Sequence, residues 1–408
     1  MKRILIASHW MEIGGAERSL LGLLDSIDYK EYQVDLFLCS HRGEFMKLIN
    51  KNVNLLPEDK KAADIAVPIK NVIKHRNFDI FIGRLIAKIA SKIYRLKNDI
   101  NKPSIVEIEN SNRFTYKFID DISKDTTYDL AISFLEPHYI VANKVKAKRK
   151  IAWMHTDYSS IDLDVKEGYK VWNLYDNIIA ISEECKESFL NKFPKLENKV
   201  IIVENIISKE FIIEQSEKIE VVSEIYKNEK NSINLLSLGR FSSAKNFDNV
   251  PKICKKILDK GVDVKWYIIG YGGGKVLIKN KINEYDVQDN VILLGKKENP
   301  YPYIKQCDIY VQPSRYEGKS VAVREAQILN KPVVITNFKT AKSQLIDGVD
   351  GVIVPMDNEG CAQGIYDLII NKELQKKLIH NTKLKDYTNK SELNKIYTLL
   401  NDNIKNIK

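Results

Sequence analysis

Short apolar runs alternate with helix-like segments along most of the chain. In the first half, the runs are rich in β-branched residues and therefore predict strands. They lie at Ile4–Ala7, Tyr32–Leu38, Leu130–Phe134, Ile151–Met154, Ile178–Ile181 and Val200–Val203. After the first run, leucines repeat at helical spacing and predict a helix over 16–27. Strands that alternate with helices are typical of a doubly wound α/β domain.

A second alternating series starts at Ile233 and predicts a second domain of the same class. Its strands are predicted at Ile233–Leu238, Val264–Ile269, Val291–Gly295, Asp308–Gln312 and Val333–Thr336. Residues 206–232 are rich in Glu and Lys and irregular in pattern, which is typical of a linker. We therefore predict domains at 1–205 and 233–390, joined by a linker region at 206–232 and followed by a polar helix at 391–408.

The composition is that of a globular protein: 408 residues, 44% hydrophobic and 29% charged, are enough for two domains with separate cores. The five cysteines are scattered without Cys-x-x-Cys spacing, which favours neither a disulfide framework nor a zinc site. The apolar run at residues 1–8 is too short for a signal peptide, and no run reaches the roughly 20 apolar residues of a membrane span. These features predict a cytoplasmic protein.

The most informative stretch is 314–332, which lies between two predicted strands. Because it reads as the loop and helix of a βαβ unit, the loop leaves a strand at its carboxyl end. Ligands of open α/β sheets bind at that edge, and a helix that opens there directs free backbone N–H groups at an anion. Ser320 has the side chain expected of the helix N-cap.

The same predicted helix carries Glu325 on its apolar face, three residues after Ala322 and four before Leu329. A buried carboxylate is strongly destabilising unless it is paired. We therefore expect a partner for Glu325, either a structural Lys or Arg or a hydroxyl group of a ligand.

Two bases, Arg240 and Lys245, flank the loop after the strand Ile233–Leu238. A guanidinium and an ammonium group in this position are suited to a diphosphate, although exposed bases in polar loops are common. The next predicted strand ends in the glycine-rich loop 270–274, which can admit a nucleotide close to the backbone but is nonspecific by itself.

Gly14 and Gly15 follow the first predicted strand and allow both a tight turn and the close approach of a ligand. Glycines open many such turns for steric reasons alone. Their spacing is not Gly-x-Gly-x-x-Gly, which counts against a nicotinamide dehydrogenase.

His155, at the end of a predicted strand, is the best candidate for a site residue among the six histidines. A lone histidine is more often a hydrogen-bonded structural residue, and His138 and His9 are poorer candidates. The tripeptide Asp162-Leu-Asp164 matches a metal-binding pattern of another fold, and we attribute the match to chance.

The net charge of +10 is concentrated in residues 60–102, which hold eleven bases and three acids. Within this range, 80–96 predicts an amphipathic helix with bases on one flank. Its apolar positions are Ile82, Leu85, Ile86, Ile89, Ile93 and Leu96, and its basic positions are Arg84, Lys88, Lys92 and Arg95. Such a helix either lies on anionic lipid or is a solvated helix packed on its own domain. Nucleic acid is not expected as a partner, because a recognition motif and stacking aromatics are missing.

Glu317 and Glu325, eight residues apart with Gly318 between them, resemble the paired glutamates of the retaining glycosyltransferases of the GT-B fold, family four, of the bacterial polysaccharide type. Arg240 followed by Lys245 is similar to the phosphate-binding pair of that family. The resemblance covers nearly the whole chain and is most specific in 233–357. The chain departs from the family at Lys319-Ser320, where Phe-Gly or Phe-Ser is usual, and at Asn330, where glycine is usual.

The resemblance implies two doubly wound, Rossmann-like domains that face each other across a cleft, the first binding the acceptor and the second the nucleotide sugar. It implies that Glu317 and His155 are catalytic residues at the donor sugar and that Glu325 holds the ribose. It further implies the following sets: for the donor diphosphate, Arg240, Lys245, Gly318, Lys319, Ser320 and Val321; for the cleft loop, Gly14 and Gly15; for the nucleobase region, Gly270, Gly272, Leu294 and Gly295. Neither a metal nor a cofactor is implied, since the nucleotide sugar is a substrate.

The predicted function is therefore retaining, metal-independent transfer of a sugar from a nucleotide diphosphate donor to a saccharide or lipid-linked saccharide in surface or capsular polysaccharide assembly. We expect a UDP-sugar rather than a GDP-sugar, because UDP-sugars are the commoner donors in the resembled family. The predicted location is cytoplasmic, at the inner face of the membrane if the helix 80–96 binds lipid. Two alternatives remain: a GT-B sugar-nucleotide epimerase, and a non-catalytic partner that binds nucleotide sugar for another transferase.

Overall fold

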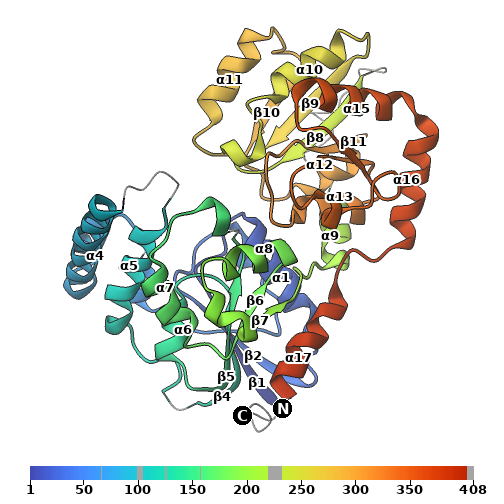
Figure 1. The fold of residues 1–408 in the computed structure, drawn as a ribbon. Helices are drawn as coiled ribbons and strands as arrows, with labels where there is room; N and C mark the ends of the chain where they lie inside the picture. Colours follow the sequence, from blue (N-terminus) through green and yellow to red (C-terminus); the bar gives the residue numbers. More distant parts are fainter. Residues whose placement is uncertain (66, 99–103, 125, 157, 219–231, 402–408) are drawn as a thin grey trace. The chain divides into compact units, whose positions relative to one another are not determined.

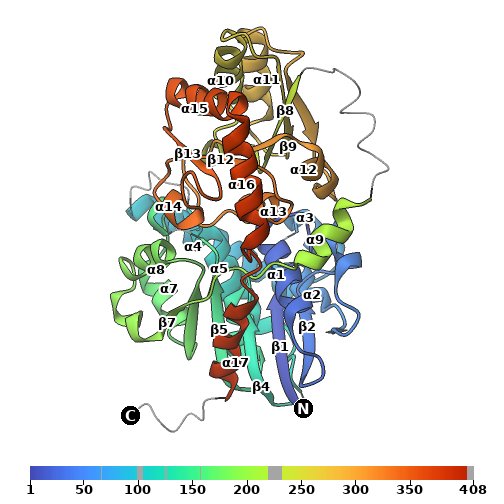
Figure 2. The same cartoon turned by 90° about the vertical axis from the view of Figure 1, so that its right-hand side faces the viewer.

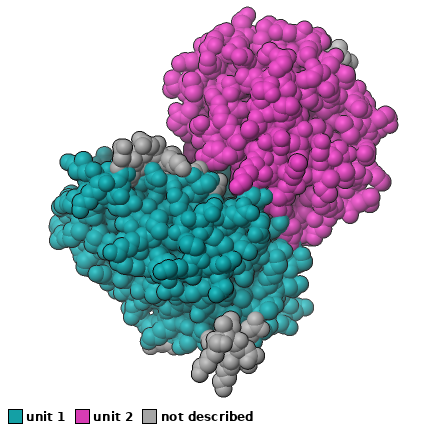
Figure 3. All heavy atoms as spheres, in the orientation of Figure 1, with its two compact units in different colours: residues 1–206, 390–408 teal, residues 207–389 magenta. Residues whose placement is uncertain are grey.

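The computed structural model describes residues 1–65, 67–98, 104–124, 126–156, 158–218 and 232–401. The chain forms two compact units (Figure 3). The first unit consists of residues 1–206 together with 390–408, and the second of residues 207–389.

The first unit is built on a sheet of seven parallel strands in the order β3-β2-β1-β4-β5-β6-β7 (Figure 1). The strands are β1 (Lys2–Ser8), β2 (Tyr32–Leu38), β3 (Asn54–Leu55), β4 (Tyr128–Ser133), β5 (Ala147–Met154), β6 (Asn177–Ala180) and β7 (Val200–Ile202). Its helices are α1 (Gly15–Ser26), α2 (Lys60–Ala63), α3 (Ile69–Lys74), α4 (Phe78–Lys97), α5 (Val106–Thr115), α6 (His138–Lys144), α7 (Val165–Trp172), α8 (Glu183–Leu190) and α17 (Leu393–Asn401).

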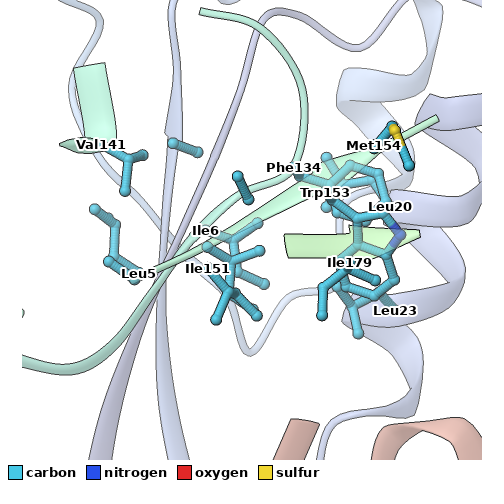
Figure 4. Close-up of a cluster of buried hydrophobic side chains, with 14 of the residues drawn as sticks. Leu5, Ile6, Leu20, Leu23, Phe134, Val141, Ile151, Trp153, Met154 and Ile179 are labelled. Carbon is cyan, nitrogen blue, oxygen red and sulfur yellow. The ribbon is translucent and has the colours of Figure 1, made fainter. Parts of the chain in front are cut away.

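The core of the first unit joins the central strands to α1. Leu5 and Ile6 of β1 lie near Ile151 of β5, while Leu20 and Leu23 of α1 pack toward Trp153 (Figure 4). All of these side chains are almost completely buried. Burial on both faces explains why the strands read as continuous apolar runs rather than as an alternating pattern.

The second unit has six parallel strands in the order β10-β9-β8-β11-β12-β13. They are β8 (Ile233–Leu238), β9 (Val264–Ile269), β10 (Val291–Gly295), β11 (Ile309–Gln312), β12 (Val333–Thr336) and β13 (Val352–Val354). Its helices are α9 (Lys209–Ser216), α10 (Val250–Leu258), α11 (Lys275–Glu284), α12 (Tyr301–Gln306), α13 (Val321–Ile328), α14 (Ala341–Gln344), α15 (Asn358–Ile370) and α16 (Lys372–Leu384). Successive residues of β8 enter different core clusters, Leu235 one and Leu236 the other, so helices cover both faces of this sheet.

These two parallel sheets confirm the predicted α/β class, and the strands predicted from apolar runs are present within a few residues of their expected bounds. The prediction of an irregular linker was wrong for its first part. Lys209–Ser216 form the helix α9, capped by the Ser208 hydroxyl. Ile207 and Ile212 belong to the core of the second unit, because this short stretch packs on α12. Residues 219–231 of the predicted linker lie outside the described residues.

The predicted C-terminal helix corresponds to α17, and Figure 2 shows it along the sheet of the first unit. The Tyr397 ring stacks on Tyr32 at 4.5 Å between centroids, and Lys2 Nζ donates to the Leu400 carbonyl at 3.2 Å. Residues 402–408 of the predicted segment lie outside the described residues. Among the helices that the structure describes, none combines the length and the apolar character needed to cross a bilayer.

Candidate functional site

The predicted donor residues of the second unit come from the carboxyl ends of neighbouring strands. Arg240 follows β8, the glycine loop 270–274 follows β9, Gly295 ends β10, and the loop 313–320 follows β11. Because all six strands are parallel, these ends meet at one edge of the sheet. Residues separated by up to eighty positions therefore share one site.

The best-defined contact at this edge joins Lys245 to Glu317. Lys245 Nζ lies 2.5 Å from Glu317 Oε1, and the two side chains are only 20% and 11% exposed. The same oxygen also accepts hydrogen bonds from Ser314 Oγ at 2.6 Å and from Gln312 Nε2 at 3.2 Å. Glu317 Oε2 accepts no hydrogen bond from the described part of the chain. The carboxylate is thus held through Oε1, while Oε2 remains available as a hydrogen-bond acceptor.

The loop that carries Glu317 is braced from two sides. Arg315 forms a bidentate ion pair with Asp248, at 2.9 and 2.7 Å, and also donates to the Ser243 carbonyl at 2.6 Å. From the start of α14, Thr340 Oγ1 donates to the Glu317 carbonyl at 2.9 Å. Sequence reasoning missed these residues, since no motif distinguishes a bracing Arg–Asp pair from surface charges.

Helix α13 begins at this loop, as predicted, and Ser320 occupies the N-cap position. Its hydroxyl does not cap the helix. Instead its backbone N–H donates to Gln344 Oε1 at 2.6 Å, and Gln344 Nε2 donates back to the Ser320 carbonyl at 3.3 Å. One of the amides predicted for the diphosphate is therefore occupied in this structure, while Gly318 and Val321 flank it at the start of the helix.

Glu325 is completely buried, with 0% of its surface exposed. Tyr301 of α12 donates its hydroxyl to Glu325 Oε1 at 3.0 Å. One partner of the buried carboxylate is thus a tyrosine hydroxyl. Because the side chain is fully buried, a ribose hydroxyl can reach this carboxylate only if a neighbouring group moves.

The glycine loop owes at least two of its glycines to internal packing. A Cβ at Gly270 would lie 1.8 Å from the Gly239 carbonyl oxygen, and one at Gly272, whose φ is +144°, would lie 2.9 Å from the Phe241 carbonyl oxygen. Gly273 has open space around it. The loop therefore packs against the backbone on both sides of Arg240. Arg240 itself is exposed, Leu294 is half-buried, and Gly295 turns the chain with a φ of +72°.

In the first unit, Gly14 and Gly15 precede the body of α1, but the chain itself supplies an acid there. The Glu17 carboxylate folds back so closely that a Cβ at Gly14 would lie 2.1 Å from Glu17 Oε2. Glu17 is buried, and an acid in the first turn is favourable next to the helix N-terminus. Sequence reasoning missed this residue, whose carboxylate covers Gly14; because that carboxylate ends a flexible side chain, the contact alone does not require glycine at position 14.

His155 follows β5 at the carboxyl edge of the first sheet and is half-buried between aromatic rings. Its ring lies 4.6 Å from that of Phe134 and stacks at 6.2 Å on Trp153. Burial lowers the pKa of His155 to about 3, although a hydrogen bond with the Phe134 backbone opposes this shift. His155 Nε2 is buried and has no hydrogen-bond partner. The side chain is therefore a neutral imidazole with one unused polar atom.

The poorer histidine candidates have structural surroundings. His138 is buried and pairs through Nδ1 with Ser133 Oγ at 2.8 Å. His9 packs on Trp10, and burial, together with Arg42, lowers the pKa of His9 to about 4. Asp164 of the Asp-x-Asp tripeptide caps α7 by accepting from two backbone amides.

Residues 218–385, less than half of the chain, match the family model described as "Glycosyl transferases group 1". An uncharacterized glycosyltransferase of Methanocaldococcus jannaschii is 31% identical over 180 residues, which cover 44% of each protein. The capsular polysaccharide biosynthesis glycosyltransferase CapM of Staphylococcus aureus is 27% identical over 239 residues, covering 54% of this chain and 61% of CapM. The chain thus matches only part of the length of these curated relatives.

A crystal structure of a mutant of S. aureus TarM, in complex with fondaparinux, alpha-GlcNAc-glycerol and UDP, is similar over both units. The TM-score is 0.68 at 15% identity, with 98% of this chain and 100% of that chain covered. This likeness shows the fold. Together, the two Rossmann-like sheets, the family match of the second unit and these relatives support a glycosyltransferase of α/β GT-B fold.

Proposed function

We propose that this protein is a retaining glycosyltransferase of family four that moves a sugar from a UDP-sugar to a hydroxyl group of a saccharide acceptor. In this proposal the second unit binds the donor, the first binds the acceptor, and the product enters a cell-surface or capsular polysaccharide. Support comes from the family match of the second unit, from the relative CapM, and from the UDP in the similar TarM crystal.

The observation that carries the proposal is the asymmetric setting of Glu317. Three donors hold Oε1, whereas Oε2 has no partner in the described residues. Oε2 is not among the buried atoms that lack a partner, so it can be reached from outside the protein. An oxygen left open at the carboxyl edge of a parallel sheet, next to a helix N-terminus, is suited to a ligand hydroxyl.

The chemistry requires that the negative charge on the departing diphosphate be stabilised. Arg240 is exposed beside Lys245, and both cations, with the start of α13, supply that charge without a metal or a cofactor. Glu317 and the neutral His155 position the donor sugar, each through its unused polar atom. We assign no nucleophile.

Donor binding is the first test, by calorimetry with UDP, GDP and NAD on the whole chain. UDP should bind, NAD should not, and Lys245→Ala should weaken UDP binding by about 10-fold to 100-fold, as expected for loss of a charge-assisted contact. The matched control is Lys279→Ala, an exposed lysine of α11 in the same unit. Failure of both diphosphates to bind, or equal affinity of the two variants, would refute the donor site.

The role of Glu325 needs a separate comparison, because its carboxylate already accepts from Tyr301. If Glu325 holds the ribose, Glu325→Gln should weaken UDP binding by about tenfold and leave inorganic pyrophosphate binding unchanged. Tyr301→Phe removes the internal hydrogen bond alone and should leave both affinities unchanged. A Glu325→Gln variant that is less stable but binds UDP normally would make Glu325 purely structural.

Turnover distinguishes transfer from the alternatives. UDP release from a UDP-sugar that depends on added saccharide, with the anomeric configuration of the donor retained in the product, supports the proposal. Formation of an altered nucleotide sugar without acceptor would identify an epimerase. Tight UDP binding without any turnover across a panel of acceptors would identify a non-catalytic partner. We propose a cytoplasmic location for the protein, at the inner face of the membrane.

A further inference from the structure

Helix α4 lies at the outer edge of the first unit, with α5 beside it (Figure 1). It docks on α5 through small residues. Gly83, Ala87 and Ser91 are four residues apart and buried, and a Cβ at Gly83 would lie 3.0 Å from the Phe114 carbonyl oxygen. Asn110 of α5 donates to Ser91 Oγ at 3.0 Å. The small side chains let the two helices approach closely, which determines the face of α4 that is buried.

The large apolar residues of α4 are left on the opposite side. Seven of them fall within an arc of about 100° on the helix, roughly 150° away from the small docking residues. Each is between 44% and 79% exposed. We call these residues the apolar stripe: Phe78, Ile82, Leu85, Ile86, Ile89, Ile93 and Leu96. A continuous apolar surface of this size normally marks a site of interaction.

Bases border the apolar stripe along one flank. Arg84, Lys88, Lys92 and Arg95 lie between the stripe and the docking face. Lys88 and Lys92 form no ion pair with the described residues, whereas Arg84 donates to the Asp64 and Val67 carbonyls and Arg95 lies 3.6 Å from Glu107. The acid of α4 itself, Asp79, is paired with Lys61. The free charge beside the stripe is therefore positive.

We propose that the apolar stripe of α4 enters the interface of an anionic lipid bilayer and that Lys88 and Lys92 contact its phosphate groups. An apolar face with bases at its border is the arrangement of helices that lie in the plane of a membrane. A second copy of the chain fits less well, because two stripes packed together would bring their basic flanks close. The biological role of this lipid contact rests on the proposed function. A transferase bound to the membrane meets a lipid-linked acceptor at the bilayer surface.

The test is sedimentation of the whole chain with vesicles of phosphatidylcholine, alone or mixed with phosphatidylglycerol. The wild type should bind the mixed vesicles at low salt and bind less in about 1 M NaCl, where surface charges are screened within about 3 Å. Lys88→Gln with Lys92→Gln should weaken binding about 30-fold, from the usual gain per base. Ile86→Gln with Ile89→Gln should weaken it by about tenfold or more.

Matched controls come from α11 of the second unit, which also exposes two apolar residues and two lysines. Val276→Gln with Leu277→Gln, and Lys275→Gln with Lys279→Gln, should bind vesicles like the wild type. Unchanged circular dichroism and UDP affinity in the α4 variants would show that the fold is intact. A chain that binds UDP but not vesicles refutes the lipid contact alone, and one that binds vesicles but not UDP refutes the donor site alone.

Two further outcomes would overturn the inference. Vesicle binding that the α4 variants retain would place the lipid contact elsewhere on the chain. A wild type that ignores vesicles but is a dimer in sedimentation velocity, with the Ile86→Gln and Ile89→Gln variant monomeric, would assign the apolar stripe to a second copy.

Discussion

Individual side chains at the two sheet edges differ in what holds them. Glu317 is fixed by Lys245, Ser314 and Gln312 through a single oxygen, so its orientation is set before a ligand arrives. His155 is fixed by stacking and by the Phe134 backbone, and its second ring nitrogen is unused. Such preorganisation reduces the cost of ordering these groups when substrate binds.

We expect Glu317→Gln to lower kcat/KM for sugar transfer by about 100-fold, because an amide cannot position a sugar hydroxyl as a carboxylate does. The UDP affinity should change little, since Glu317 is assigned to the sugar. Glu359→Gln is the matched control, as it removes a carboxylate paired with Lys256 on the surface of the same unit. Equal activity of both variants would remove Glu317 from the site.

His155 predicts a pH dependence of stability. Burial holds the folded-state pKa near 3, below the usual 6.5, so the unfolded chain binds the proton more readily. The stability contributed by the neutral ring is complete above pH 6.5 and is lost as the pH falls toward 3. Between pH 7 and pH 5, the free energy of unfolding of the wild type should fall by about 2 kcal/mol more than that of His155→Gln. Parallel urea-unfolding profiles for the two proteins from pH 7 to 5 would contradict this.

At the scale of the elements, the proposed donor site depends on how strand ends pack against one another. Gly239 directly follows β8 and Gly270 directly follows β9, and the absence of a side chain at Gly270 lets the two backbones touch. The Gly239 N–H donates to the Ile269 carbonyl, and the Gly270 N–H donates to that of Gly295. The three strand ends therefore form one hydrogen-bonded platform beneath Arg240.

Gly270→Ala should destabilise the chain by about 1–3 kcal/mol, because its Cβ would overlap the Gly239 carbonyl and force the strand ends apart. The same shift should weaken UDP binding. Gly273→Ala is the control, since its Cβ meets no atom within 4 Å and its φ is not positive. Urea unfolding that shows equal stability for the two variants would contradict the packing argument.

For the whole molecule, each unit has its own sheet and its own buried core, which is the condition for independent folding. The second unit also includes α9, although that helix precedes its first strand. Ile207 and Ile212 bury their side chains there, and the Ile207 N–H donates to the Thr388 carbonyl at 2.9 Å.

A fragment of residues 207–389 should therefore fold cooperatively and bind UDP with an affinity within about tenfold of the whole chain. A fragment of residues 233–389, which lacks α9, should be less stable by roughly 3–6 kcal/mol, the value of two buried isoleucines. Thermal unfolding of both fragments measures the difference. Equal melting temperatures would mean that α9 is not part of the second core.

How much of the candidate site could be predicted depends on how far apart in the sequence the interacting residues are. The sequence indicated that the loops carrying Arg240, Lys245 and Glu317 lie at one edge of the sheet, because each loop follows an apolar strand and parallel strands bring such loops together. The roles assigned to these residues came from the family resemblance. The bracing pair Arg315–Asp248 and the Tyr301–Glu325 hydrogen bond were not predicted, because their partners are 67 and 24 residues apart and no local pattern links them. Ser320 was correctly predicted as the N-cap residue, but the contact of its backbone with Gln344, 24 residues away, was not predicted.

The sequence by itself determined the fold class, since buried parallel strands require apolar β-branched runs and the helices between them require a 3.6-residue period. It also determined that α4 has two distinct faces. Only the tertiary structure decided which face is buried: close helix packing favours the small residues Gly83, Ala87 and Ser91, and so the apolar stripe faces outward. Likewise, only packing on α12 made α9 part of the second unit, because burial depends on neighbours that are distant in the sequence.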